Sequence, residues 1–256
     1  MKHFWKVASL SIIAGSILMI SCKKETETPA DVIVPVPSKA AVSLQFSNEV
    51  DGTPIAFGNL DYVNPSGETF SVTTLKYYVS HASLVDANGM EVALNEHNLI
   101  DQGNPDSWNF MMANIPNGNY TTLRLHIGVE EEHNHSGDQT GALDPINGMI
   151  WTWNTGYIFF KHEGQFVHTN NSTQALTYHY GTDQAYATVD IPISFELKGV
   201  DKTIKVVFNL NDLYRSPTMI EFSGNNMHQS TSANDIPWLN AMKENFGYSF
   251  SAVVVN

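Results

Sequence analysis

Apolar and polar residues alternate along several segments of the chain, and this two-residue period is typical of β-strands with one buried face. In residues 120–129 one face would carry Leu123, Leu125, Ile127 and Val129. Arg124 and His126 would fall on the opposite face. The same alternation occurs in residues 42–46, 187–198 and 204–210, so each is predicted to be a half-buried strand.

Turn-forming residues separate these strands. Residues 69–85 read as one long or bent strand, and turns are indicated at Asn88–Gly89, Pro116–Gly118 and Glu163–Gly164. The short connection at residues 199–202 predicts a hairpin between two successive strands.

Helical patterns are scarce. Residues 211–215 fit a single turn, and residues 232–245 fit a short helix with a polar cap and Pro237 in its first turn. About nine or ten strands without intervening helices favour an all-β fold, an antiparallel β-sandwich with long loops and a short C-terminal helix. A chain of 256 residues with 42% hydrophobic and 11% aromatic residues can bury one substantial core.

The N-terminus has the organisation of an export signal. Lys2 and Lys6 precede a short apolar run at residues 7–20, which is too short for a typical membrane span. The run ends in Leu18-Met-Ile-Ser-Cys22, which resembles a bacterial lipoprotein processing site. We therefore expect a signal peptide at residues 1–21 and a lipid on Cys22, although a plain secretory signal with an incidental cysteine is the alternative.

Cleavage would remove two of the 13 basic residues and none of the 26 acidic ones, which leaves a net charge of −15. Such a charge argues against nucleic acid as a partner. Residues 22–40 combine charge, proline and small residues, as expected of a flexible tether, and residues 41–256 would form the sandwich domain. The protein is then expected in the cell envelope, anchored to the outer membrane on its periplasmic or outer face.

The segment from residue 129 to residue 153 breaks the alternation. It is a long loop rich in acids, histidine and glycine, and long loops in compact domains are often functional. His133 and His135 lie on alternate positions, which allows both to contact one metal ion, but without a third ligand in view a solvated acidic loop is the better explanation. Oxygen ligands for calcium are also present in this loop: Glu130, Glu131, Glu132, Asp138 and Asp144.

Residues 141–145, Gly-Ala-Leu-Asp-Pro, and residues 148–164, Gly-Met-Ile-Trp-Thr-Trp-Asn-Thr-Gly-Tyr-Ile-Phe-Phe-Lys-His-Glu-Gly, resemble the signature of the MbnP-like proteins. Supporting segments include Tyr178-His-Tyr-Gly181 and the region 228–246. That family is related to copper proteins of methane-oxidising bacteria. The resemblance spans most of residues 41–250.

The resemblance implies an exported β-rich protein that binds copper and is a substrate of a di-haem enzyme of the cytochrome c peroxidase type. The enzyme would oxidise a tryptophan to kynurenine, which joins histidines as a copper ligand in related proteins. The matching tryptophan is Trp151 or Trp153, and the best matching histidines are His179 and, second, His228. A relative has a histidine ligand two residues after the modified tryptophan, where this chain has Thr155.

The other histidines are interpreted without a metal. His162 and His168 flank the expected turn at Glu163–Gly164 and are predicted to be exposed, and no role is assigned to three more: His81, His97 and His126. Imidazole nitrogen suits copper, and two histidines with one further nitrogen fit Cu(I).

No motif of a catalytic nucleophile, a zinc protease or a phosphate-binding loop is present, so the chain is expected to be no enzyme itself. Two alternatives stay open. One is an outer-membrane lipoprotein whose loops bind a glycan or a protein without metal. The other is a hydrolase with paired carboxylates on the same sandwich.

Overall fold

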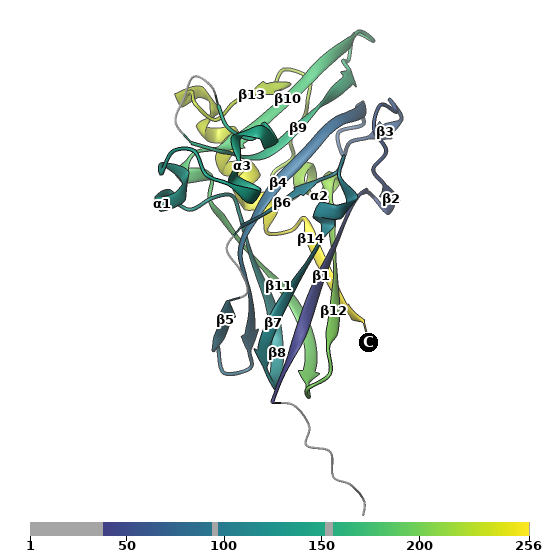
Figure 1. The fold of residues 1–256 in the computed structure, drawn as a ribbon. Helices are drawn as coiled ribbons and strands as arrows, with labels where there is room; N and C mark the ends of the chain where they lie inside the picture. The colour runs from purple at the N-terminus through teal and green to yellow at the C-terminus, as the bar shows by residue number, and fades with distance from the viewer. Residues whose placement is uncertain (1–37, 94–96, 152–155, 256) are drawn as a thin grey trace, which may run out of the picture. The chain divides into compact units, whose positions relative to one another are not determined.

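The computed structural model describes residues 38–93, 97–151 and 156–255. The signal segment, residues 22–37 of the expected tether and Trp153 lie outside this part of the chain, whereas residues 39 and 40 already belong to the first strand. The described residues fold into two β-sheets packed face to face (Figure 1). This confirms the predicted β-sandwich. None of the described helices is long and apolar enough to cross a membrane.

The smaller sheet is built on the first strand, with strand order β14-β12-β1-β2 and β7 also paired to β1. Its strands are β1 (Lys39–Val50), β2 (Thr53–Pro54), β7 (Asn109–Pro116), β12 (Lys202–Asn209) and β14 (Phe250–Val255). The alternation predicted for β1 and β12 is observed, because Val42, Leu44, Ile204 and Val206 are all fully buried.

The larger sheet has the order β11-β8-β4-β9-β10-β13, and three short strands also pair with β4. Its strands are β3 (Tyr62–Val63), β4 (Thr69–Asp86), β5 (Glu91–Ala93), β6 (His97–Asp101), β8 (Gly118–Ile127), β9 (Ile158–Val167), β10 (Thr173–Gly181), β11 (Ala187–Leu197) and β13 (Met227–His228). The long strand predicted at residues 69–85 is therefore confirmed as β4.

Helices are short and occupy the connections. They are α1 (Glu131–Asn134), α2 (Leu210–Arg215) and α3 (Ile236–Phe246), with 3₁₀ turns at Pro105–Trp108, Gly141–Leu143, Pro145–Asn147, Asp183–Ala185 and Ala233–Asp235. Both predicted helical segments are confirmed, and Pro237 lies in the first turn of α3. In Figure 1, α1 and α3 lie toward the end of the sandwich where β9, β10 and β13 are found.

The hairpin predicted at residues 199–202 is wrong. β11 pairs with β8 in the larger sheet, whereas β12 pairs with β14 and, in parallel, with β1 in the smaller sheet. The connection therefore crosses between the sheets. An alternating pattern identifies the buried face of a strand, but it does not identify the neighbouring strand.

The turn predicted at Glu163–Gly164 is also wrong, because both residues lie inside β9. A side chain at Gly164 would place its Cβ 1.9 Å from the carbonyl oxygen of Ser71 on the neighbouring β4. The glycine therefore permits close approach of two strands rather than a turn.

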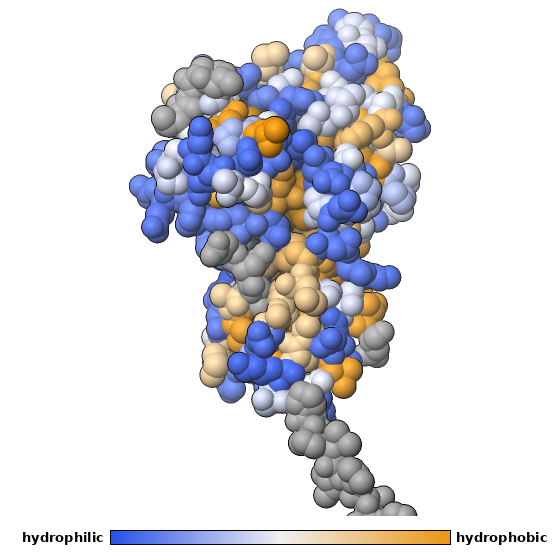
Figure 2. Space-filling model, viewed as in Figure 1, coloured by the Kyte–Doolittle hydropathy of each residue, from blue (hydrophilic) through white to orange (hydrophobic). Residues whose placement is uncertain are grey.

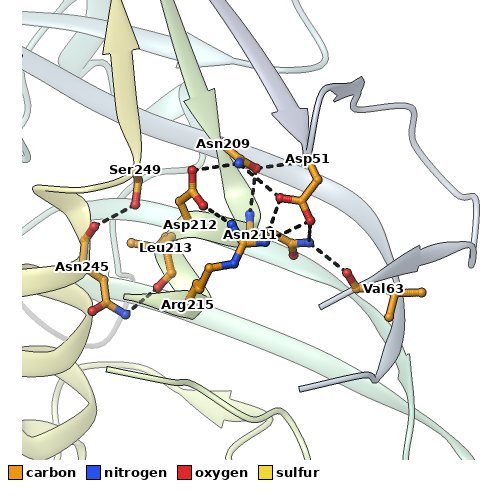
Figure 3. Close-up of polar contacts among 9 residues, drawn as sticks. All are labelled: Asp51, Val63, Asn209, Asn211, Asp212, Leu213, Arg215, Asn245 and Ser249. Carbon is orange, nitrogen blue, oxygen red and sulfur yellow. Dashed lines mark hydrogen bonds and ion pairs between the residues drawn. The ribbon is translucent and has the colours of Figure 1, made fainter. Parts of the chain in front are cut away.

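A polar network joins the end of β1 to α2 (Figure 3). Asp51 accepts hydrogen bonds from Asn211 Nδ2 at 2.7 Å and from Arg215 Nη2 at 2.9 Å. Asn211 Nδ2 also donates to the carbonyl oxygen of Val63 at 2.8 Å, and the Asn209 side chain accepts from the N–H of Asn211 at the start of α2. These hydrogen bonds give partners to polar groups at the end of β1 and hold α2 against it, so the role of this cluster is structural.

Tyr157 and the 3₁₀ turn Gly141–Leu143 lie against the larger sheet at β4 and β6. The ring of Tyr157 packs edge-on against Tyr78 of β4, with centroids 5.8 Å apart. Both tyrosines are buried, so this face of β4 is covered even though it points away from the smaller sheet. The surface over α1 is mainly hydrophilic (Figure 2).

Candidate metal centre

Three side chains converge where this loop meets the sheet. They are His81 of β4, His97 at the start of β6, and Glu130 immediately before α1. One ligand atom from each lies within 4.8 Å of the others, and this is the single such group of three found in the part of the chain that the structure describes. Glu130 Oε2 lies 3.1 Å from His81 Nε2 and 2.9 Å from His97 Nε2.

A distortion of β4 directs His81 toward this point. The pairing of β4 with β8 shifts register between Ser80 and Ser83, and His81 has a φ of +43° inside the shift. Bulges of this kind re-aim side chains, and a positive φ is uncommon for residues other than glycine. Ser80 pairs with His97 on β6, so the distortion brings His81 beside it.

Gly128 allows the chain to leave β8 and reach the same point. Its φ is +120°, and a Cβ there would lie 2.3 Å from the Phe159 ring. Only glycine fits such a backbone and such a close approach. Val129 is then fully buried, which leaves Glu130 at the edge of the sheet facing the two imidazoles.

Asn134 fixes the position of α1 after Glu130. This buried side chain donates to Asp183 Oδ1 and accepts from the backbone N–H of Tyr157, both at 2.7 Å. Gly156 permits the contact, because a Cβ there would lie 2.8 Å from Asn134 Oδ1. The helix that follows Glu130 is thus attached to the Gly148–Tyr157 motif.

Two more imidazoles border the cluster. His133 Nδ1 of α1 contacts Glu130 Oε1, and the rings of His133 and His97 have centroids 4.8 Å apart. His126 lies on the other side of His81, at 6.5 Å between centroids. Its ring stacks on Tyr186, and its Nδ1 pairs with Thr188 Oγ1 at 3.1 Å. His133 is therefore a candidate fourth donor, whereas His126 is engaged elsewhere.

The surroundings of Glu130 and His97 favour the protonation states in which these side chains bind metal ions. Desolvation opposes the charge on Glu130, but the hydrogen bond from His97 and the neighbouring imidazoles lower the pKa of this carboxyl to about 2. Burial lowers the pKa of His97, and the neighbouring His133 and His81 add to that effect. A carboxylate and a neutral imidazole are the forms that bind metal ions.

The donor set itself fits a transition metal. Two imidazole nitrogens and one carboxylate oxygen form a mixed set that Cu(II), Zn(II) and Fe(II) accept, and copper has the highest affinity in the usual order of divalent ions. Calcium prefers six to eight oxygen ligands. The nitrogen donors therefore make calcium a poor match for this cluster.

A hollow of about 800 Å³ opens beside the cluster. Its lining consists of His97, His133 and the residues Gln139, Thr140, Gly141, Ala142 and Leu143. A second hollow of about 350 Å³ shares His97, Gly141 and Ala142 with it and continues along the start of the 3₁₀ turn at Pro105–Trp108.

The structure does not bring together the histidine pair expected from the resemblance. His179 Nε2 lies 2.8 Å from Glu163 Oε1, whereas His228 Nδ1 lies 2.7 Å from Asp235 Oδ1. His228 is paired in register with Tyr178 and contacts its ring. Because neighbours along a strand alternate, His179 and His228 lie on opposite faces of the sheet.

Of the two expected tryptophans, the structure describes Trp151. Trp151 is buried, and its indole ring lies against Gly181, where a Cβ would approach within 2.5 Å. Gly181 is two residues after His179 on β10. Trp153 and the lipidation residue Cys22 lie outside the described residues. A centre formed by a tryptophan with His179 or His228 stays a prediction.

The remaining candidates have partners of their own. His135 pairs with Asp183 at 2.8 Å, and Asp144 accepts from the N–H of Ile146 at the start of a 3₁₀ turn. His162 is fully buried beside Tyr214, so its predicted exposure is wrong. His168 is at the turn between β9 and β10, where its backbone N–H donates to Ser172.

The sequence pattern indicates no role for His81 and His97, and it indicates only calcium for Glu130. The three donors belong to different elements and share no local spacing. The available signal was the loop at residues 129–135, in which glutamates precede two histidines, together with histidines on the nearby strands.

Comparison with known proteins agrees with this architecture. A search of curated proteins gave no match. Among solved structures, MbnP from Methylosinus trichosporium superimposes with a TM-score of 0.54 at 17% identity, covering 85% of this chain and 99% of that one. At such low identity the match shows a shared fold. The sequence pattern that defines the MbnP family matches residues 39–234, and the chain therefore belongs to the MbnP family.

Proposed function

We propose that this protein is a lipid-anchored copper-binding protein of the bacterial cell envelope, and that His81, His97 and Glu130 hold the ion. The observation that carries the proposal is the convergence of three donor atoms within 4.8 Å of one another. His133 contacts Glu130 beside this set of three donors. Membership of the family supports copper as the first metal to test.

The anchor and the partner are parts of the same proposal. Cys22 would carry the lipid that holds the domain at the outer membrane. A di-haem enzyme of the cytochrome c peroxidase type would oxidise Trp151 or Trp153 to kynurenine, and this chain would supply no catalytic group of its own. Intact mass of protein produced with that enzyme tests the modification, because kynurenine exchanges one carbon of tryptophan for one oxygen.

Copper binding can be tested on two candidate centres at once. The wild type, H81A, H97A and E130Q would be loaded with Cu(II), dialysed and analysed for copper per chain. H179A and H228A test the pair expected from the resemblance, and H135A is a control on the same loop as Glu130. The proposal expects copper to be lost in the first three variants and retained in the other three.

Two other results are informative. Loss in H179A or H228A with full retention in H97A would move copper to the centre expected from the resemblance. Absence of copper from the wild type would contradict copper binding altogether. Parallel loading with Ca²⁺ is expected to leave no bound calcium, because nitrogen donors suit that ion poorly.

A second candidate function follows from the hollow beside His97. Its volume of about 800 Å³ is in the range of small-molecule sites, and Gln139 and Thr140 offer polar contacts. A loop site for a glycan or a protein segment would use this space without metal. Binding that is equal in wild type and H97A, and unaffected by a chelator, would favour this function.

A further inference from the structure

We infer that the metal centre keeps one coordination position open toward the hollow, and that this position takes a neutral nitrogen-donor ligand from solution. The inference rests on the proposed metal binding and adds the class of ligand that the same site recognises. Three protein ligands with one free position are typical of sites that exchange a bound molecule.

The arrangement of the donors supports an open position. His81 and Glu130 approach from the strand and from the start of α1, and His97 is nearly buried, with 6% of its side chain exposed. His97 and His133 line the hollow, so the space begins at the donor cluster itself. A small molecule can therefore reach the metal without movement of the sheet.

The chemistry of the walls favours a neutral or cationic ligand over an anion. Neither hollow is lined by lysine or arginine. Of the two aspartates in the lining of the second hollow, Asp101 is paired with Lys76 at 2.9 Å, so the negative charge of that hollow comes from Asp106. Asparagine side chains contribute amide groups along the second hollow, at Asn98, Asn104, Asn109 and Asn147. An uncharged heterocycle such as an imidazole or a pyridine meets donors and acceptors here, whereas a carboxylate meets negative charge.

His133 is the protein side chain that could compete with an external ligand for this position. Its Nδ1 contacts Glu130 Oε1 on the side of the hollow, and a shift of α1 would let it bind the metal. Asn134 opposes such a shift through its bonds to Asp183 and to the N–H of Tyr157. We therefore assign the open position to an external ligand and keep His133 as the wall of the hollow.

The test uses the full chain loaded with Cu(II), with copper per chain measured before and after each titration. Imidazole is the probe, and binding is followed by the electron paramagnetic resonance and visible spectra of the bound ion. One saturable spectral change per copper is expected. A142F and T140W would fill the hollow from its walls and are expected to weaken imidazole binding at least ten-fold without loss of copper.

A matched control is available in the same segment. Ile146 is 87% exposed and does not line either hollow, so I146W should bind imidazole as the wild type does. The charge preference is tested with nicotinamide and nicotinate, which share a pyridine nitrogen and differ in charge. Nicotinamide is expected to bind at least three-fold more tightly at low salt, with a smaller difference at high salt.

Several outcomes overturn the inference. They are an unchanged spectrum in imidazole, removal of copper by imidazole, equal binding in A142F and wild type, or tighter binding of nicotinate. A spectral change that appears only in H133A would show that His133 occupies the position. If the wild type holds no copper before the titration, the proposed function fails first, and the copper measurement distinguishes that failure from a closed coordination position.

Discussion

Asn134 Oδ1 accepts a hydrogen bond from the backbone N–H of Tyr157 at 2.7 Å, and this contact attaches the helix beside the proposed metal centre to Tyr157 of the motif at residues 148–164. Glu130 and the motif are far along the sequence from the strands that carry His81 and His97. The bond therefore explains how the motif, which contains none of the three proposed ligands, could position the proposed metal site.

N134A should weaken metal binding although Asn134 contacts no ligand atom of the proposed set. Loss of a direct hydrogen-bond partner of a metal ligand commonly lowers metal affinity by about 10- to 100-fold, so removal of this more distant support should lower it by less than that. The variant also leaves the N–H of Tyr157 without its buried partner, which should lower the free energy of unfolding by about 1–3 kcal/mol. Competition titration with a copper chelator and urea unfolding measure the two effects.

D138A, on the exposed part of the same loop, is the control and should change neither quantity appreciably. Wild-type copper affinity in N134A would show that α1 keeps its place without this residue.

G164A should destabilise the protein by more than about 2 kcal/mol, because the new methyl group would lie 1.9 Å from the Ser71 carbonyl oxygen. G137A is the comparison: Gly137 has a φ of +81° but nothing within 4 Å of the added Cβ. That variant is expected to cost only about 1 kcal/mol of backbone strain. Equal unfolding free energies for the two variants would refute the close-approach explanation of Gly164.

The stability of the fold should decrease in acid partly because of His162. Burial lowers the pKa of this imidazole to about 3. An unfolded histidine binds a proton below about pH 6.5, so the unfolded state holds more protons between about pH 6.5 and pH 3. Unfolding free energy should therefore fall with decreasing pH in this window, by up to about 1.4 kcal/mol per pH unit from this residue.

H162Q keeps a polar atom for Tyr214 but removes the titration, so the pH dependence should become shallower even though the variant is less stable overall. Urea unfolding at several pH values from 4 to 7 measures the slope. H168Q, in the turn between β9 and β10, is the control and should retain the wild-type slope. An unchanged slope in H162Q would assign the acid sensitivity to other groups.

Local patterns predicted the faces of strands correctly. Leu123, Leu125 and Ile127 are buried, as expected from alternation, because the side-chain period depends on the strand backbone alone. Pairing depends on the whole chain, and for that reason the connection between β11 and β12 was mistaken for a hairpin. Gly164 is a similar case. The sequence alone does not distinguish a glycine that permits close packing of two strands from a glycine that forms a turn.

The residues of the proposed metal centre could be predicted only in part. The loop at residues 129–153 was recognised as the place for chemistry, and Glu130 and His133 do lie there. His81 and His97 were not recognised, because a bulge in β4 and the pairing of β6 bring them together, and neither is visible in a linear pattern.

The position of copper itself tests the account most directly. Crystals of the protein loaded with copper would be measured on both sides of the copper absorption edge, and an anomalous difference map calculated. We expect one peak at about 2 Å from His81 Nε2, His97 Nε2 and Glu130 Oε2, the usual range for such metal–ligand bonds. A peak beside Trp151 and His179, with none at Glu130, would contradict the account.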